Sequence, residues 1–280
     1  MAAEAASVRD LLTAAALRLG ADDAGSEAAL LLAQVLAKPR AWLAAWPEYA
    51  PDPTQRARFA ALVEARARGE PVAYLLGWRG FWTFDLQVSP AVLIPRPETE
   101  LLVELALERL PRAAASHIAD LGTGSGAIAI ALARERPRAS VRATDASADA
   151  LAVARANAAR LAAHGVGFAQ GHWCEALGTA RFDMIVANPP YIAAGDAHLA
   201  QGDLRFEPVA ALASGADGLD AIRTIITQAP RHLLADGWLL LEHGHDQGAA
   251  VRALLAAAGC REVATVRDLA GNERVSLARR

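Results

Sequence analysis

The 280-residue chain is long enough for two domains or for one large domain with an extension, and its leucine, valine and isoleucine content predicts a packed core rather than a disordered chain. With 28 basic against 31 acidic residues and a net charge of -3, the protein as a whole does not look built to bind a phosphate backbone, although a local basic patch stays compatible with this balance. The two distant cysteines, Cys174 and Cys260, indicate neither a disulfide framework nor a zinc site, and with no signal-peptide pattern or bilayer-length apolar run we expect a soluble cytoplasmic protein.

The first 76 residues predict a bundle of short amphipathic helices. A capping box at Ser7–Asp10 precedes apolar residues at helical spacing, and this pattern stops at Gly20. A second apolar stripe covers about 26–37, and a third helix is indicated at Asp52, where a proline follows a capping residue. Because such short helices bury their apolar faces against one another, we expect a helical domain over residues 1–76.

Three aromatic residues of this segment, Trp42, Trp46 and Tyr49, have two interpretations. They could present a surface to a partner. Aromatic residues in a small bundle more often belong to its core, because each buries a large apolar area. A place in the core is therefore our expectation for them.

The hydrophobic period changes after the bundle. Apolar residues between Trp78 and Val88, many of them aromatic, predict a β-hairpin, and we expect residues 77–95 to link the bundle to the rest of the chain. A helix with leucines on one side begins after Pro97, whose acidic neighbours are favourable at a helix start.

From residue 96 onward the sequence alternates between strands and helices. The predicted strands are 117–121, 140–144, 166–170, 182–187, 238–242, 262–267 and 274–278. The predicted helices among them are 127–134, 148–162, 219–234 and 247–258. Repeated βα units with right-handed crossovers predict an α/β domain over residues 96–280, with a doubly wound, mostly parallel seven-stranded sheet. Its last strand should run antiparallel, because it comes after a β–β connection.

A glycine-rich turn joins the first predicted strand of this sheet to a helix, and its residues are Gly122, Thr123, Gly124, Ser125 and Gly126. Glycines allow the backbone to approach a ligand closely, and the helix start offers free N–H groups. Asp145 ends the next strand, where a carboxylate can accept both hydroxyls of a ribose. This combination predicts a nucleoside-containing cofactor, while the G-x-G-x-G spacing departs from the dinucleotide fingerprint.

The apolar strand at 182–187 is followed by Asn188, Pro189, Pro190 and Tyr191. In open α/β sheets, ligands bind at the carboxyl ends of strands. The prolines stiffen this loop and lack N–H groups, so that it offers carbonyl oxygens with few donors nearby. The Asn188 side chain adds one more acceptor. Such a loop suits a substrate with an NH2 group, and we expect the chemistry to occur here.

These motifs resemble those of class I methyltransferases that use S-adenosylmethionine and modify planar nitrogens: Asp120–Gly126, Asp145 and Asn188–Tyr191. Three further stretches narrow the resemblance to the HemK/PrmC group: 94–100, 202–208 and 272–274. This group contains the N(5)-glutamine methyltransferases of peptide chain release factors, and the resemblance extends over the whole chain. It implies a Rossmann-like fold, S-adenosylmethionine as cofactor with S-adenosylhomocysteine as product, and the glutamine of a release factor's Gly-Gly-Gln loop as substrate.

The resemblance also implies roles for individual residues. The turn 122–126 would hold the methionine part of the cofactor, Asp145 its ribose, and Trp173 would pack near the adenine. Asn188 would contact both cofactor and substrate. The residues expected to contact the substrate amide are Asn188, Pro189, Pro190 and Tyr191. The expected catalytic residues among them are Asn188 and Pro189, whose oxygens accept the amide N–H bonds, and Tyr191, which packs against the amide.

Two other functions fit parts of the sequence. Adenine-N6 methylation of DNA or RNA also acts on a planar NH2 group, but the chain lacks a large basic target-reading domain. A non-catalytic module that binds the ribosome or a release factor would not need both Asp145 and the Asn188 loop intact. We therefore expect an active, monomeric enzyme whose partners are release factors, without stable nucleic-acid or membrane binding. Because one glutamine side chain offers little selectivity, we expect the N-terminal helices to dock the protein substrate.

Residues 242–246, which include His243 and His245, have some of the side chains that a metal site would need. Two histidines two positions apart are a poor ligand set without a third ligand at suitable spacing. We expect no metal site.

Overall fold

The computed structural model describes residues 6–280, so the first five residues of the predicted helical domain lie outside the described part. The chain divides into two compact units, residues 1–77 and 78–280. Across residues 6–280, none of the helices combines the length and apolar character needed to cross a membrane.

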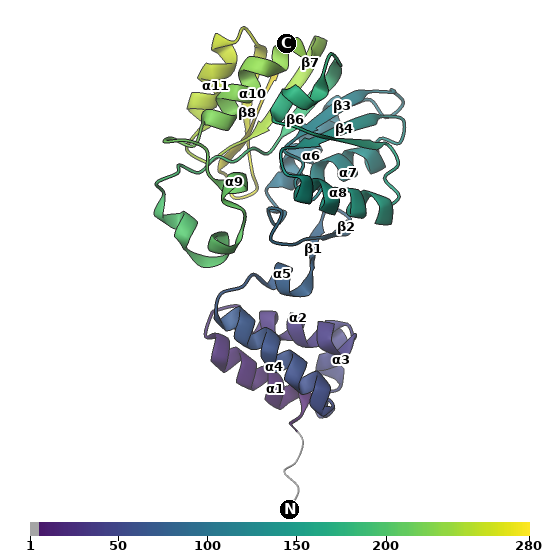
Figure 1. Ribbon diagram of the computed structural model, residues 1–280, viewed down its shortest axis with the longest axis vertical. Coiled ribbons are helices and arrows are strands. Elements are labelled where there is room, and N and C mark those ends of the chain that lie inside the picture. Colours follow the sequence, from purple (N-terminus) through teal and green to yellow (C-terminus); the bar gives the residue numbers. More distant parts are fainter. Residues whose placement is uncertain (1–5) are drawn as a thin grey trace, which may run out of the picture. The chain divides into compact units, whose positions relative to one another are not determined.

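The N-terminal unit is helical, as the apolar spacing predicted (Figure 1). Its helices are α1 (Val8–Leu19), α2 (Ala24–Leu36), α3 (Arg40–Ala45), α4 (Pro53–Ala67) and α5 (Val72–Leu76). Capping boxes open α1 and α4, where Ser7 and Asp52 accept hydrogen bonds from the third backbone N–H of each helix. The core between these helices includes Leu31 and Leu32, which are fully buried.

Two of the three aromatic residues Trp42, Trp46 and Tyr49 lie outside the core of this unit. Trp42 packs against the core from its edge, but Trp46 and Tyr49 are 59% and 43% exposed. The expectation that all three belong to the core is therefore wrong for Trp46 and Tyr49. Leucines fill the interior, and Trp46 directly follows the short helix α3, so its ring stacks on Trp42 at the surface. The three rings form an aromatic cluster in which Trp46 and Tyr49 face solvent and Trp42 lies against the core.

The predicted hairpin is present as β1 (Trp78–Phe81) and β2 (Phe84–Gln87), which pair antiparallel. It belongs to the second unit, where Phe81 and Leu86 enter a hydrophobic core. The buried Asn157 side chain fastens it further, because Asn157 accepts from the Gln87 N–H at 2.7 Å and donates to the Gln87 carbonyl at 2.9 Å.

The second unit is built on a seven-stranded sheet in the order β5-β4-β3-β6-β7-β9-β8. The strands are β3 (His117–Leu121), β4 (Ser140–Asp145), β5 (Val166–Gln170), β6 (Phe182–Ala187), β7 (Leu233–Glu242), β8 (Arg261–Arg267) and β9 (Glu273–Arg279). The α-helices are α6 (Thr99–Arg109), α7 (Ala127–Glu135), α8 (Ala148–Arg160), α9 (Val209–Leu212), α10 (Asp220–Gln228) and α11 (Gly248–Ala257). The 3-10 helices are η1 (Trp173–Leu177), η2 (Ala197–Ala200), η3 (Gly202–Phe206) and η4 (Ala229–Arg231).

The sheet is parallel except for β9, which runs antiparallel to both β7 and β8, as predicted. Helices α6, α7 and α8 pack on one face around one hydrophobic core, and α10 and α11 pack on the other face around a second core (Figure 1). The chain order reverses between the neighbouring strands β3 and β6. Such a reversal point is where open α/β sheets bind ligands, and both the glycine turn and Asn188 come directly after these strands.

Two neighbouring elements differ from their predictions. The helix expected over 219–234 ends as α10 at Gln228, continues as the short η4 and gives way to β7 at Leu233. Pro230 explains the early stop, because its ring clashes with the preceding turn and it has no N–H for the helical hydrogen bond. Strand β7 therefore begins earlier than predicted, before a register irregularity against β6.

Candidate active site

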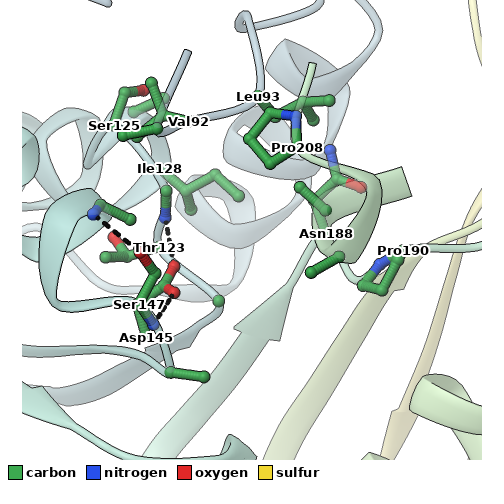
Figure 2. Close-up of a pocket in the computed structure, with 18 of the residues that line it drawn as sticks. Val92, Leu93, Thr123, Ser125, Ile128, Asp145, Ser147, Asn188, Pro190 and Pro208 are labelled. Carbon is green, nitrogen blue, oxygen red and sulfur yellow. Dashed lines mark hydrogen bonds between the residues drawn. The ribbon is translucent and has the colours of Figure 1, made fainter. Parts of the chain in front are cut away.

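A cavity of about 340 Å³ lies at the carboxyl ends of the strands, a size typical of small-molecule sites. Predicted site residues that line it are Gly122, Thr123, Gly124, Ser125, Asp145, Trp173, Asn188 and Pro190. Asn188, Pro190 and Pro208 stand on one side of it and Thr123, Asp145 and Ser147 on the other (Figure 2). Gly126, Pro189 and Tyr191 are not among its lining residues. The fold thus brings the glycine turn and the Asn188 loop to one cavity.

The glycine turn adopts a backbone that favours glycine at each of its three glycine positions. Gly122, Gly124 and Gly126 have φ of 73°, 55° and 86°, in the left-handed region. A side chain at Gly122 would lie 3.2 Å from the Trp173 ring, and one at Gly126 would lie 3.0 Å from Ile130. At Gly124 nothing stands within 4 Å. The outer glycines therefore permit close packing, while the middle one borders open space in the cavity.

Asp145 is held rigidly at the end of β4. One carboxylate oxygen accepts from the Gly124 N–H and the other from the Ser147 N–H, both at 2.9 Å. A carboxylate oxygen can accept more than one hydrogen bond, so both remain able to bind hydroxyl groups of a ligand. The contact with Gly124 also fixes the glycine turn against β4.

Asp120 lies beneath the turn and is completely buried. One of its oxygens accepts from the Thr123 hydroxyl at 2.6 Å and from the Ala129 N–H at 3.2 Å, while the other has no partner within residues 6–280. Burial raises the pKa of Asp120 to about 7, against the lowering effect of these hydrogen bonds. The sequence showed Asp120 only as part of a motif and gave no sign of its burial.

Trp173 opens η1 with a φ of 48°, an uncommon conformation for a bulky residue. Its ring lies against Gly122 and forms part of the cavity wall. A strained aromatic residue that borders a cavity suggests a role in binding.

The Asn188 side chain has a fixed orientation. Its amide nitrogen donates to the Thr99 hydroxyl oxygen at 3.0 Å, and Thr99 is buried at the start of α6. The amide oxygen of Asn188 therefore lies on the side away from Thr99. Thr99 also lines the cavity. Thr99 lies within the stretch 94–100 that carries the resemblance, but its position is typical of the first turn of any helix, so no role at the site was expected for it.

Tyr191 is partly buried, and this burial raises the pKa of its hydroxyl above the usual range. The Tyr191 carbonyl accepts from the Gln247 side chain at 2.9 Å. On the same side Gly218 approaches so closely that a side chain there would lie 2.1 Å from the Tyr191 oxygen. Gln247 and Gly218 thus fix the far end of the loop, and no local motif indicated either contact.

Two further segments form the remaining wall of the cavity. Arg96 forms an ion pair with the buried Glu207, which also accepts from the Ile94 N–H at 3.0 Å. Just beyond, Ile192 forms an isolated β-bridge with Ala213. The contacts of Glu207 connect the segment before α6 with the segment around η3 and α9, and both contribute lining residues.

Of the two histidines after β7, His243 is engaged in the protein's own hydrogen bonds. The His243 ring is buried and contacts the Ser276 hydroxyl at 2.9 Å and the Gly244 carbonyl at 2.8 Å. Burial also lowers the pKa of His243. Within residues 6–280 no cluster of three potential metal ligands occurs.

Comparisons with known proteins agree with this architecture. Residues 98–205 match the family model described as methyltransferase small domain. A methyltransferase structure from Pyrococcus furiosus shares the fold with a TM-score of 0.54 at 18% identity, covering 80% of this chain and 97% of that one. A 16S rRNA methyltransferase structure from T. thermophilus, in complex with AdoMet and guanosine, shares it with a TM-score of 0.52 at 22% identity, covering 72% and 49%. The chain therefore has the Rossmann-like fold of class I methyltransferases.

The family within this class is shown by closer relatives. Residues 10–77 match the PrmC N-terminal domain. The release factor glutamine methyltransferase of Xylella fastidiosa is 57% identical over 269 residues, 96% of each chain. That of Pseudomonas aeruginosa is 55% identical over 248 residues, 89% of this chain and 90% of the relative. The chain belongs to the family of release factor glutamine methyltransferases, and the resemblance drawn from its motifs is confirmed.

Proposed function

We propose that the protein transfers the methyl group of S-adenosylmethionine to the side-chain amide nitrogen of the glutamine in the Gly-Gly-Gln motif of peptide chain release factors. The products are the methylated release factor and S-adenosylhomocysteine. The relatives named release factor glutamine methyltransferase, at 55% and 57% identity, support this substrate. A role in translation termination places the protein in the cytoplasm.

The residues around the cavity fit this cofactor. The backbone of 122–126 borders open space at Gly124, where the methionine part would lie. Asp145 would accept the ribose hydroxyls with its two fixed oxygens, and Trp173 would pack against the adenine. When bound, S-adenosylmethionine supplies an electrophilic methyl group on a positively charged sulfur. The fold neighbour with bound AdoMet supports the same assignment.

The target nitrogen is a poor nucleophile, because the lone pair of an amide is delocalised into its carbonyl. Acceptors on the two N–H bonds would orient the nitrogen and stabilise the positive charge that develops on it. We assign this role to the side-chain oxygen of Asn188 and the backbone oxygen of Pro189. Pro190 and Tyr191 would border the flat amide group.

One observation carries this proposal: the hydrogen bond from the Asn188 amide nitrogen to Thr99, at the edge of the cavity. A side-chain amide is symmetric in shape and could present either end to a ligand. Thr99 takes up the nitrogen end and leaves the oxygen for the substrate, so the acceptor is oriented before the substrate arrives.

The direct test is Asn188→Ala. We expect the variant to fold and to bind cofactor, but to transfer methyl groups at least about a hundredfold more slowly, the typical effect of removing one preorganised partner. Tritium transfer from labelled cofactor should be measured in parallel with a release factor and with DNA, and cofactor affinity by calorimetry. Mass spectrometry of release factor from cells with and without the protein would identify the modified glutamine.

Each alternative has its own outcome in these assays. Wild-type turnover by Asn188→Ala would contradict the role of the loop. Label in nucleic acid alone would indicate adenine methylation, and absence of cofactor binding at high concentration would indicate a non-catalytic binding module.

For the N-terminal unit we propose docking of the protein substrate outside the cavity. Trp46 and Tyr49, the exposed members of the aromatic cluster, support this assignment, because exposed aromatic residues are frequent at protein interfaces. Deletion of residues 1–75 should then weaken methylation of whole release factor far more than it weakens cofactor binding.

A further inference from the structure

Glu242 is a buried carboxyl group behind the loop that carries Asn188. It is the last residue of β7 and only 1% exposed. Strand β7 pairs with β6 so that Leu241 lies opposite Ala187, which places Glu242 beside Asn188 at the same edge of the sheet. Neither Glu242 oxygen has a hydrogen-bond partner of standard geometry within residues 6–280. A buried carboxyl group without such partners is costly, so its presence calls for an explanation.

Two hydroxyl groups lie close to this carboxyl. The hydroxyls of Thr99 and Tyr191 both lower the pKa of Glu242, although burial dominates and raises that pKa to about 7. The charged groups nearby are Arg274, which lowers the pKa of Glu242, and Glu98, which raises it. The hydroxyls belong to the two residues that hold the ends of the loop, since Thr99 accepts from Asn188 and Tyr191 terminates the motif.

We propose that Glu242 is a positioning residue for methyl transfer: its carboxylate is placed to accept hydrogen bonds from the hydroxyls of Thr99 and Tyr191, neither of which has standard hydrogen-bond geometry in the structure, and thereby fixes both ends of the Asn188 loop. This inference rests on the proposed role of Asn188. Glu242 lies outside the cavity lining and acts through Thr99 and Tyr191, without contact with substrate.

The direction of these hydrogen bonds determines the orientation of Asn188. A threonine hydroxyl has a single hydrogen. If Thr99 donates it to Glu242, its oxygen can only accept from Asn188, so the nitrogen end of the Asn188 amide faces Thr99. The oxygen end is then reserved for the substrate. A chain of hydrogen bonds that begins at a charged carboxylate also strengthens each of its members.

Protonation of Glu242 reverses this arrangement. The protonated carboxyl becomes a donor, and its hydrogen can be given to Thr99, which then no longer has to accept from Asn188. The rate of methyl transfer at saturating substrate should therefore fall as the pH drops below about 7. Asp120 also has a pKa near 7, so the effect must be assigned through variants of Glu242.

The test compares wild type with Glu242→Gln, Thr99→Val and Thr99→Ser, using a release factor as substrate. Glu242→Gln keeps the shape and removes the charge, and Thr99→Val keeps the shape and removes the hydroxyl. Each should lower kcat by about tenfold to a hundredfold, with KM for cofactor changed by less than about threefold. Thr99→Ser restores the hydroxyl and should return kcat to within about threefold of wild type.

Two readouts separate positioning from a merely structural role. The decrease in kcat below pH 7 should disappear in Glu242→Gln. The double variant Glu242→Gln, Thr99→Val should have a kcat only slightly below that of the slower single variant, because both changes interrupt the same chain of hydrogen bonds. Additive losses, or a kcat and pH profile like wild type in Glu242→Gln, would overturn the proposal. If Glu242→Gln does not fold, Thr99→Val decides in its place, because it should also abolish the pH dependence and Thr99→Ser should restore it.

Asn188→Ala serves as the control that separates this proposal from the function it rests on. A slow Asn188→Ala together with fast Glu242→Gln and Thr99→Val would reject the role of Glu242 alone. Wild-type rates in all three would reject the role of the loop itself.

Discussion

Replacing Gly218 by alanine should reveal how strongly the structure fixes the Asn188–Tyr191 loop. Gly218 has a φ of 78°, and an added side chain would lie 2.1 Å from the Tyr191 carbonyl oxygen and 2.7 Å from the Gln247 amide nitrogen. Gly259 is a matched control, because its φ is 77° and nothing lies within 4 Å of the same added atom. The two variants share the backbone strain and differ in the contact with the loop.

The expected magnitude comes from this comparison. Alanine in the left-handed region costs about 1–2 kcal/mol at either glycine. At Gly218 the Tyr191 carbonyl must also move, and loss of its hydrogen bond to Gln247 adds about 1 kcal/mol or more. We expect Gly218→Ala to lower the free energy of unfolding by about 3 kcal/mol and Gly259→Ala by about 1.5 kcal/mol. A loop displaced by about 1 Å should slow methyl transfer by about a hundredfold.

Urea unfolding of both variants gives the stability difference, and tritium transfer to a release factor gives kcat. Gly259→Ala should keep the wild-type kcat. Equal destabilisation of the two variants, together with wild-type kcat in Gly218→Ala, would refute the reasoning that Gly218 holds the loop in place.

Three other predictions concern the turn, the pH dependence and the N-terminal unit. Asn157→Ala leaves Gln87 and the Ser125 carbonyl without their hydrogen-bond partner. It should lower the free energy of unfolding in urea by about 2–4 kcal/mol and weaken the affinity for S-adenosylhomocysteine. An unchanged affinity would show that the glycine turn does not depend on Asn157. Burial raises the pKa of Asp120 to about 7, so the folded state is favoured while Asp120 is protonated, fully so below about pH 4, and this stability is lost as the pH rises through about 7. The urea midpoint of Asp120→Asn should therefore fall less than that of wild type between about pH 4 and pH 7.5, and parallel curves would contradict this. Trp46→Ser should raise KM for the release factor and leave the affinity for S-adenosylhomocysteine unchanged, whereas an unchanged KM would remove Trp46 from the docking surface.

The sheet could be predicted because its residues obey simple local rules. The strands at 117–121, 166–170 and 182–187 are apolar runs bounded by turn residues, and the structure has β3, β5 and β6 at these same bounds. The helix before β7 ends earlier than predicted, because the apolar pattern continues past Pro230 while the helical hydrogen bonds do not. The local apolar pattern predicts that an element exists more reliably than it predicts the residue at which the element ends.

The site could be predicted only where one short stretch contained the signal. The glycine turn and the Asn188 loop are such stretches. Thr99 lies 89 residues from Asn188 in the sequence, and only folding brings the two together. In the sequence Glu242 looks like an ordinary last residue of a strand. That its carboxyl group lacks a hydrogen-bond partner depends on the residues around it in the folded protein. The prediction for Trp46 is wrong for the same reason, since composition does not show which apolar side chains occupy the core and which remain at the surface.

The segment between Ile192 and Glu207 is anchored at both ends, by the bridge from Ile192 to Ala213 and by the ion pair from Glu207 to Arg96. Its helix η2 has no buried residue. Lengthening a loop whose ends are fixed adds little closure entropy, because that cost grows only slowly with length. Insertions between the anchors could therefore alter the outer surface of the enzyme in different lineages while the wall of the cavity keeps its shape, and selectivity for protein substrates could evolve separately from the chemistry.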